Sequence, residues 1–311
     1  MPLFKSEKSI AIAQLLIAAI LWGGSFTWVK WALEGFSTTQ LLFWRFVLGF
    51  LLGEICLFIF KTQEYKNSHT DIKLAKYTGL FLALTLLSQI HGLNFTTATN
   101  SSFITTTYVV MIPFISFIIF RNKIKFRDVS LALLAMSGMS LLLNLQETGS
   151  QFLNTLNKGD FLTLFSAFFG ALHIIFVSRF ASNCKSAFRF NTYQNFWSAL
   201  VLLPFLLFEM SKLNLNFYPT SPSIKSILGL SLLVVFVTMI AFLLQITAQK
   251  KLSTSTSSML CLLEAPFAFI FAYFLLNETI NMFQTIGALI ILVSAFLAAY
   301  LEDSKKIPII S

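Results

Sequence analysis

Charged side chains inside otherwise apolar segments are the residues of this chain best suited to do chemistry. Glu264 lies near the middle of an apolar stretch over about 254–276, and Arg45 lies within another over about 38–60. An ionised side chain at the centre of a membrane span costs about 2.5–3.5 kcal/mol on insertion scales. At that cost, Glu264 is expected either to bind a solute amine or a proton, or to tie neighbouring spans together through hydrogen bonds.

Arg45 has two interpretations of equal weight. Its planar guanidinium is suited to a carboxylate. Alternatively, its long stem carries the charge outward to the membrane surface, or the side chain serves packing between helices. Glu54 follows nine residues later, so a helix places it on the face opposite Arg45 and the two cannot pair within their own helix.

Three uncharged candidates complete the set of predicted substrate-binding residues. Trp22 precedes Gly23 and Gly24, which let another backbone or a solute approach closely. Tyr108 and His173 each lie in a different apolar segment, where they either line a cavity or bond a neighbouring helix. The predicted site is therefore Glu264 first, then Arg45, Trp22, Tyr108 and His173.

The composition indicates a membrane protein. Of the 311 residues 56% are hydrophobic and 11% are charged, and the mean hydropathy is +0.78. A helix needs about 20 apolar residues to cross a bilayer, and the near-continuous apolar runs favour helices over a barrel. We predict an all-α protein with ten spans, at about 10–29, 38–60, 73–93, 100–120, 127–145, 160–180, 190–210, 224–246, 254–276 and 282–301.

The basic residues predict the orientation of these spans. With the N-terminus inside, 17 of the 22 Lys and Arg residues fall in cytoplasmic segments, four fall outside, and Arg45 lies within a span. Lys and Arg accumulate in short cytoplasmic loops, so both termini are predicted to be cytoplasmic. The net charge of +9 is spread over six short segments rather than one face, which argues against a nucleic-acid partner and suits an anionic lipid surface.

The chain also carries an internal duplication. A Ser/Thr-rich stretch leads to Pro113 in the first half and to Pro266 in the second, at an offset of 153 residues. A unit with an odd number of spans must be followed by its copy in the opposite orientation. We therefore predict two inverted five-helix repeats, at residues 1–146 and 147–311.

Several motifs resemble a known family. The sequence Trp22-Gly23-Gly24-Ser25-Phe26, Arg45, and Glu264-Ala265-Pro266 leading through Asn277-Glu278 to Gly287 are similar to the EamA-type family of the drug/metabolite transporter superfamily. The resemblance covers about residues 10–301. It implies ten helices in two inverted five-helix repeats around a central cavity, which export or import small organic solutes such as amino acids and metabolites. The first half has Arg121-Asn122 where the second has Asn277-Glu278, so this carboxylate has no counterpart.

No motif for a metalloprotease, a serine hydrolase or a nucleotide-binding loop is found in the sequence. The expectation is a non-enzymatic secondary transporter without cofactor or metal, an exporter or exchanger of small organic metabolites in the cytoplasmic membrane, with protons as a second candidate partner. The alternative is a non-transporting scaffold or regulatory partner built on the same fold.

Overall fold

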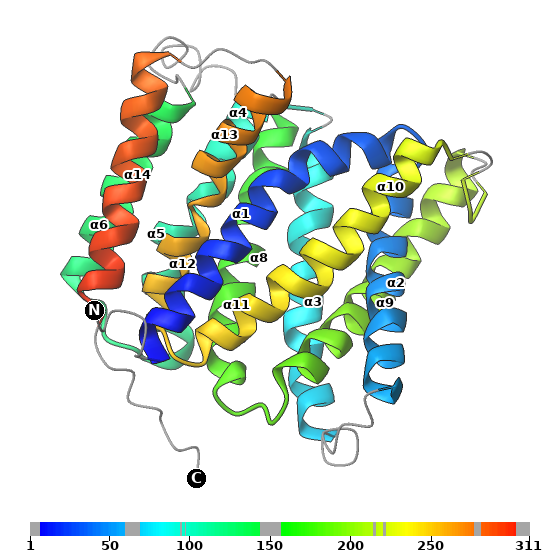
Figure 1. The fold of residues 1–311 in the computed structure, drawn as a ribbon, viewed down its shortest axis with the longest axis horizontal. Coiled ribbons are helices and arrows are strands. Elements are labelled where there is room, and N and C mark those ends of the chain that lie inside the picture. The colour runs from blue at the N-terminus through cyan, green and yellow to red at the C-terminus, as the bar shows by residue number, and fades with distance from the viewer. Residues whose placement is uncertain are drawn as a thin grey trace.

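The computed structural model shows a bundle of helices. It describes residues 7–59, 69–93, 95–96, 98–143, 157–213, 216–219, 222–276 and 281–302. Within these residues the chain forms helices and connecting turns, with no strand (Figure 1). The predicted boundary between residues 146 and 147 and the Asn277-Glu278 pair lie outside the described part.

The helices follow the apolar segments of the sequence. The first half contains α1 (Glu7–Leu33), α2 (Thr38–Ile59), α3 (His69–Leu93), α4 (Ala98–Thr106), α5 (Tyr108–Phe120) and α6 (Phe126–Leu142). The second half contains α8 (Lys158–Ala181), α9 (Ala187–Leu213), α10 (Ile224–Leu232), the π-helix η3 (Leu233–Ala241), α11 (Phe242–Gln249), α12 (Thr254–Cys261), α13 (Glu264–Leu276) and α14 (Met282–Tyr300).

Each of the ten predicted spans coincides with one of these helices or with an end-to-end series of them. Among the described residues, eight helical segments are long and apolar enough to cross a membrane. The remaining two predicted spans are α3 and α6, which has only 17 residues. The all-helical membrane fold is thus supported, and the count of ten spans stays a prediction.

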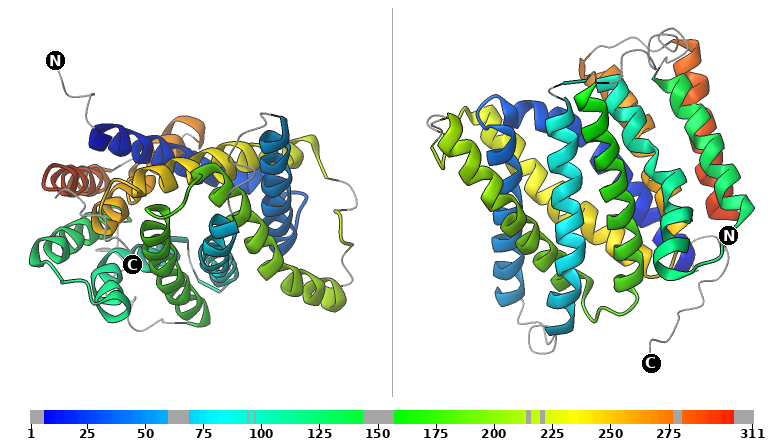
Figure 2. Two further views of the ribbon diagram at one scale, coloured as in Figure 1. Left: turned by 90° about the horizontal axis from the view of Figure 1, so that it is seen from below. Right: turned by 180° about the vertical axis from the view of Figure 1, so that it is seen from behind.

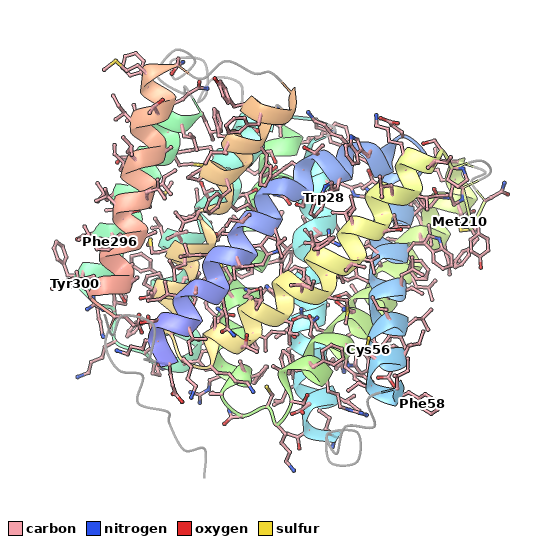
Figure 3. All side chains as sticks on the ribbon, viewed as in Figure 1. Trp28, Cys56, Phe58, Met210, Phe296 and Tyr300 are labelled. Atoms are coloured by element: carbon pink, nitrogen blue, oxygen red, sulfur yellow. The ribbon has the colours of Figure 1, made fainter. Side chains whose placement is uncertain are left out.

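The outer surface of the bundle is apolar. Phe58, Phe296 and Tyr300 are 78%, 66% and 77% exposed, and Figure 3 shows them extending outward from the bundle. Large exposed apolar side chains occur on both α2 and α14, and extensive apolar surface is rare on soluble monomers. It is the surface expected of helices that contact lipid.

Two spans are broken in mid-course, one in each half. The turn at Thr107 separates α4 from α5, and residues Leu262 and Leu263 separate α12 from α13. Pro266 lacks an amide hydrogen and cannot bond the carbonyl four residues earlier, which belongs to Leu262. Pro113 likewise cannot bond the carbonyl of Val109, a residue that lies two positions after the first break. A proline therefore follows each break within its span.

The span between α10 and α11 is wound as a π-helix over nine residues, Leu233–Ala241. At its end the amide of Phe242 donates to the carbonyl of Val237, five residues earlier. Such segments are rare and often lie at functional sites. The wider winding changes the direction in which every later side chain of the span points.

Glycines join α6 to α14, which lie side by side in Figures 1 and 2. A Cβ atom added to Gly138 would lie 2.8 Å from the carbonyl oxygen of Gly287, and one added to Gly287 would lie 2.4 Å from the amide nitrogen of Leu142. The backbones therefore touch, as in membrane helix pairs built on small residues. We call this contact the α6–α14 seam.

Polar contacts gather the predicted cytoplasmic segments at one end of the bundle, the lower end in Figure 1. They join Lys8 to the carbonyl of Glu302, Arg127 to the carbonyl of Leu301, Lys251 to Glu7, Lys250 to the carbonyl of Cys184, and the amides of Lys185 and Ser186 to Asp71. We call this the basic end. At the opposite end Lys225 pairs with Glu34.

Candidate functional site

Glu264 is the first residue of α13, directly after the break that follows α12. It interacts electrostatically with Arg45 of α2 and with Tyr108, the first residue of α5. Within the described residues, Glu264 and Arg45 form no direct ion pair. The two breaks thus position Tyr108 and Glu264, while α2 brings Arg45 within electrostatic range of Glu264 without a direct ion pair.

Arg45 is buried in the bundle, with 6% of its surface exposed. Its Nε donates a hydrogen bond to Thr238 Oγ1 at 2.7 Å. The side chain therefore points inward, and the interpretation that it reaches outward to the membrane surface is wrong. Its acceptor, Thr238, lies in the π-helix, so the irregular winding serves the same site.

Trp22 and His173 meet on a shared neighbour. The ring of Phe242 lies 5.7 Å from the Trp22 ring and 6.0 Å from the His173 ring, measured between centroids. His173 Nε2 also lies 3.3 Å from Gln194 Oε1. Because Phe242 follows the π-helix directly, these two predicted residues lie beside the segment that holds Thr238.

The two glycines after Trp22 differ in what they face. A Cβ atom on Gly23 would lie 2.7 Å from Phe267 Cβ and 2.8 Å from the amide nitrogen of Ala268, whereas one on Gly24 would make an ordinary contact of 3.5 Å with the Phe271 ring. The prediction that this pair admits another backbone is confirmed for Gly23. The contact fixes α1 against the first turns of α13, next to Glu264.

The Ser/Thr stretch before α12 caps the helix. Ser253 Oγ accepts a hydrogen bond from the amide of Thr256, and Glu302 accepts from both the amide and the hydroxyl of Ser253 at 2.8 Å. Side-chain oxygens at this position satisfy the free amides of the first turn. Ser253 is therefore the N-terminal cap of α12.

A cavity of ≈ 150 Å³ opens beside this cap at the basic end. Its lining includes Lys123, Lys125 and Arg127 from the α5–α6 connection and Ser253 to Ser255 from α12. Asp128 and the nearby Glu302 carboxylate offset part of that positive charge. The cavity is a polar vestibule on the side of the bundle where the basic segments gather.

Sequence reasoning missed the uncharged partners of the site. Thr238 and Asn191 contact each other, since Asn191 Nδ2 donates to the Thr238 carbonyl at 3.0 Å. Gln194, the partner of His173, was among several lone amides in the sequence. A neutral polar residue within an apolar run gives a weak signal, because the same residue equally suits a contact between helices.

Comparison with known proteins gives the family. The model of the EamA-like transporter family matches residues 9–144 and again residues 157–300. This chain belongs to the EamA-like transporter family.

Relatives of this chain are named as transporters. An uncharacterized transporter of Archaeoglobus fulgidus is 30% identical over 288 residues, which cover 92% of this chain and 84% of the relative. The uncharacterized transporter YetK of Bacillus subtilis is 28% identical over 211 residues, or 68% of this chain and 62% of the relative. A crystal structure with 15% identity matches 95% of this chain and 99% of its own, with a TM-score of 0.73. The relatives support a multi-pass membrane transporter, and the crystal structure shows the shared fold.

Proposed function

We propose that this EamA-like protein is a secondary transporter, an exporter or exchanger of small organic metabolites such as amino acids across the cytoplasmic membrane. The observation that supports this proposal is the placement of Glu264 and Arg45. They lie inside the bundle, close enough to interact electrostatically, but form no direct ion pair within the described chain. A carboxylate suits a solute ammonium, and a guanidinium suits a solute carboxylate. A zwitterion satisfies both.

The mechanism that we propose is alternating access between two inverted repeats, residues 1–146 and 147–311. The breaks before α5 and α13 support it, because discontinuous helices hold the solute near the midplane in many secondary transporters. Figure 1 also supports it: α1 rises from the basic end, whereas α8, the first helix of the second half, descends toward it. Trp22, Tyr108 and His173 line the solute site in this proposal.

The proposed orientation places both termini in the cytoplasm. The basic end collects the described segments richest in Lys and Arg, and such segments are held at the inner face. Protons are the proposed coupling ion, with Glu264 as the group that binds them, because it is the carboxyl group at the start of the second half-helix.

The first experiment is a thermal-shift screen of the purified protein against amino acids, organic acids and amines. A ligand at 100 times its dissociation constant adds about 2.7 kcal/mol of stability. Uptake of the hit into proteoliposomes then tests transport, with empty vesicles as the blank. A scaffold without transport activity would give no uptake above that blank for any stabilising solute.

Glu264→Gln tests the assigned residue, because it keeps the shape of the side chain and removes the charge. We expect loss of uptake and of solute-induced stabilisation for amine-containing solutes. Unchanged affinity, uptake and pH response would remove Glu264 from the mechanism. Gln284→Glu is a matched control at the first turn of α14, where the side chain caps the helix by accepting from the amide of Asn281.

A further inference from the structure

Four amide side chains lie inside the second half of the bundle. Asn191, Gln194 and Asn195 belong to α9, and Gln245 belongs to α11. All four are at most 2% exposed. We call these four residues the amide layer.

The described protein satisfies only part of their hydrogen-bonding capacity. Asn191 Nδ2 donates to the carbonyls of Thr238 and Met239 at 3.0 and 3.2 Å. Gln194 Oε1 pairs with His173 Nε2, and Asn195 Nδ2 has only the weak acceptor Met239 Sδ at 3.8 Å. Each of these amides is therefore held at one end.

The other end of each amide has no partner within the described chain. The unsatisfied atoms are Asn191 Oδ1, Asn195 Oδ1, Gln245 Oε1 and Gln194 Nε2. Rotating the Gln194 amide would exchange its two ends and leave the oxygen unsatisfied instead. Buried amide groups without partners are strongly disfavoured, so four of them on α9 and α11 point to a ligand.

The chemistry of these atoms selects water. Three are acceptors and one is a donor. A metal ion would satisfy only the oxygens and would lie near the Arg45 guanidinium, which reaches Thr238, whereas an anion would satisfy only the amide NH₂ group. Water donates and accepts, and buried waters typically make about three hydrogen bonds to such groups.

The amide layer extends from near the basic end into the bundle. Asn191 lies four residues after the first residue of α9, and Gln245 lies four residues before the last residue of α11. Both of these helix ends are at the basic end (Figure 1). Deeper in the bundle the layer reaches Thr238, whose carbonyl accepts from Asn191 and whose hydroxyl accepts from Arg45.

Beyond the opposite end of α9, aromatic rings from α2 and from the segment after α9 pack together. Trp44 stacks on Tyr218 with centroids 4.8 Å apart and meets the Phe217 ring edge-on at 5.3 Å. Trp44 Nε1 also donates to the Phe217 carbonyl at 3.1 Å. The indole N–H of Trp44 is thus paired, in contrast to the unsatisfied atoms of the amide layer.

We propose that the amide layer is a hydrated path through which water from the basic end reaches Arg45 between α8, α9 and α11. Its role as the access route for solute or protons rests on the proposed transport function, whereas its hydration does not. In this proposal, water enters the bundle from the basic end and not from the end where Trp44 and Tyr218 lie.

Thiol labelling tests the hydration directly. Gln245→Cys is made in full-length protein whose Cys56, Cys184 and Cys261 are replaced by Ala, and is treated in detergent with a small charged methanethiosulfonate. The matched control is Ile246→Cys, at the adjacent position of α11, which is 1% exposed and packs in an apolar cluster. We expect labelling at position 245 to be at least tenfold faster than at 246.

Equal, slow labelling at both positions would overturn the proposal, provided that Lys251→Cys at the exposed helix end reacts rapidly. Gln245→Leu supplies a second measurement that needs no thiol. In a dry interface this change removes an unsatisfied oxygen and raises the melting temperature, whereas in a hydrated one the melting temperature stays the same or falls. A rise would also overturn the proposal.

Neither measurement depends on transport. Rapid labelling without uptake of any solute would contradict the proposed function and leave the hydrated path intact. Uptake without labelling would contradict the hydrated path and leave the proposed function intact.

Discussion

The α6–α14 seam and the amide layer are both buried between helices. The seam is a contact between two backbones at glycines, whereas the amide layer consists of polar side chains. In the seam, Gly138 and Gly287 bring two backbones together, and the one buried hydroxyl, that of Ser294, bonds the carbonyl of Ile291 in its own helix. In the amide layer, four side chains keep unsatisfied atoms within the described structure. The first contact is complete without any ligand, and the second is not.

The two regions are therefore expected to have different roles, the seam in the stability of the fold and the amide layer in the proposed transport. Close backbone packing has little freedom to rearrange, because each contact already lies at its distance limit. An interface of amides can exchange one hydrogen-bond partner for another, such as water. Substitutions in the two regions are therefore expected to affect different measurements.

The largest effect is expected at Arg45, where the amide layer meets the proposed solute site. Arg45→Lys keeps the charge but loses the planar fork and the Nε bond to Thr238. A hydrogen bond to a charged group contributes about 1.5–3 kcal/mol, so the dissociation constant of a carboxylate-bearing solute should rise by about tenfold or more. Solute-dependent thermal shift measures it, and Thr238→Ser, which keeps the accepting hydroxyl, is the control. Unchanged affinity in Arg45→Lys would separate Arg45 from recognition.

A smaller effect, and on stability alone, is expected in the seam. Gly287→Ala places a methyl group 2.4 Å from the Leu142 amide nitrogen, and overpacking of this kind costs about 1–3 kcal/mol. We expect a lower melting temperature with unchanged solute affinity per folded molecule. Leu289→Val is the control, since Leu289 is 54% exposed on the same helix. A loss of affinity without loss of stability would show that the seam is part of the site.

An intermediate position tests whether the two regions are coupled. Ser253 caps α12 and is bonded by Glu302, directly beyond α14. Ser253→Ala removes the cap, which costs about 0.5–2 kcal/mol, while Ser253→Asn should retain most of the stability. Thermal unfolding of both variants checks this. Equal melting temperatures for Ala and Asn would show that the hydroxyl does not stabilise the helix start.

The smallest effect is expected at Gly24, which touches neither region. Gly24→Ala adds a methyl group at an ordinary contact distance of 3.5 Å from the Phe271 ring, and it should change stability by less than about 0.5 kcal/mol. Gly23→Ala, one residue earlier, meets the Ala268 amide nitrogen at 2.8 Å and should be destabilising. Comparable melting curves for the two variants would contradict the close approach of α1 to α13.

Much of the fold was predictable because lipid imposes a simple rule on sequence. Long apolar runs must be helices when they cross a bilayer, so the positions of the helices followed from composition and length. The duplicated prolines, Pro113 and Pro266, also lie in the two interrupted spans. Gly23 and Gly24 indicated a close approach by a backbone or a solute, but not that α13 is the partner. These features depend on properties of single residues or of continuous segments.

The arrangement of the candidate site was harder to predict. Glu264 and Arg45 stand out as charges in apolar segments, yet their proximity depends on how α2 packs against the start of α13. Thr238 gave no signal, because a threonine among valines and leucines looks like an ordinary residue of a span. The π-helix that presents it has no sequence mark of its own, since Leu233–Ala241 would suit an α-helix equally well.

That π-helix also bears on how the eighth predicted span tolerates changes in chain length. Removing a single residue from Leu233–Ala241 would let the segment relax from wide turns to ordinary α-helical winding. The loss of one residue and the tighter winding of its neighbours rotate the later side chains in opposite directions, so Phe242 and Gln245 would lose only part of their present orientation. A deletion in α11 has no wide turn to offset it and would swing every later side chain by about 100°. Deletions should therefore be better tolerated in Leu233–Ala241 than in α11, an asymmetry that a library of length variants would reveal.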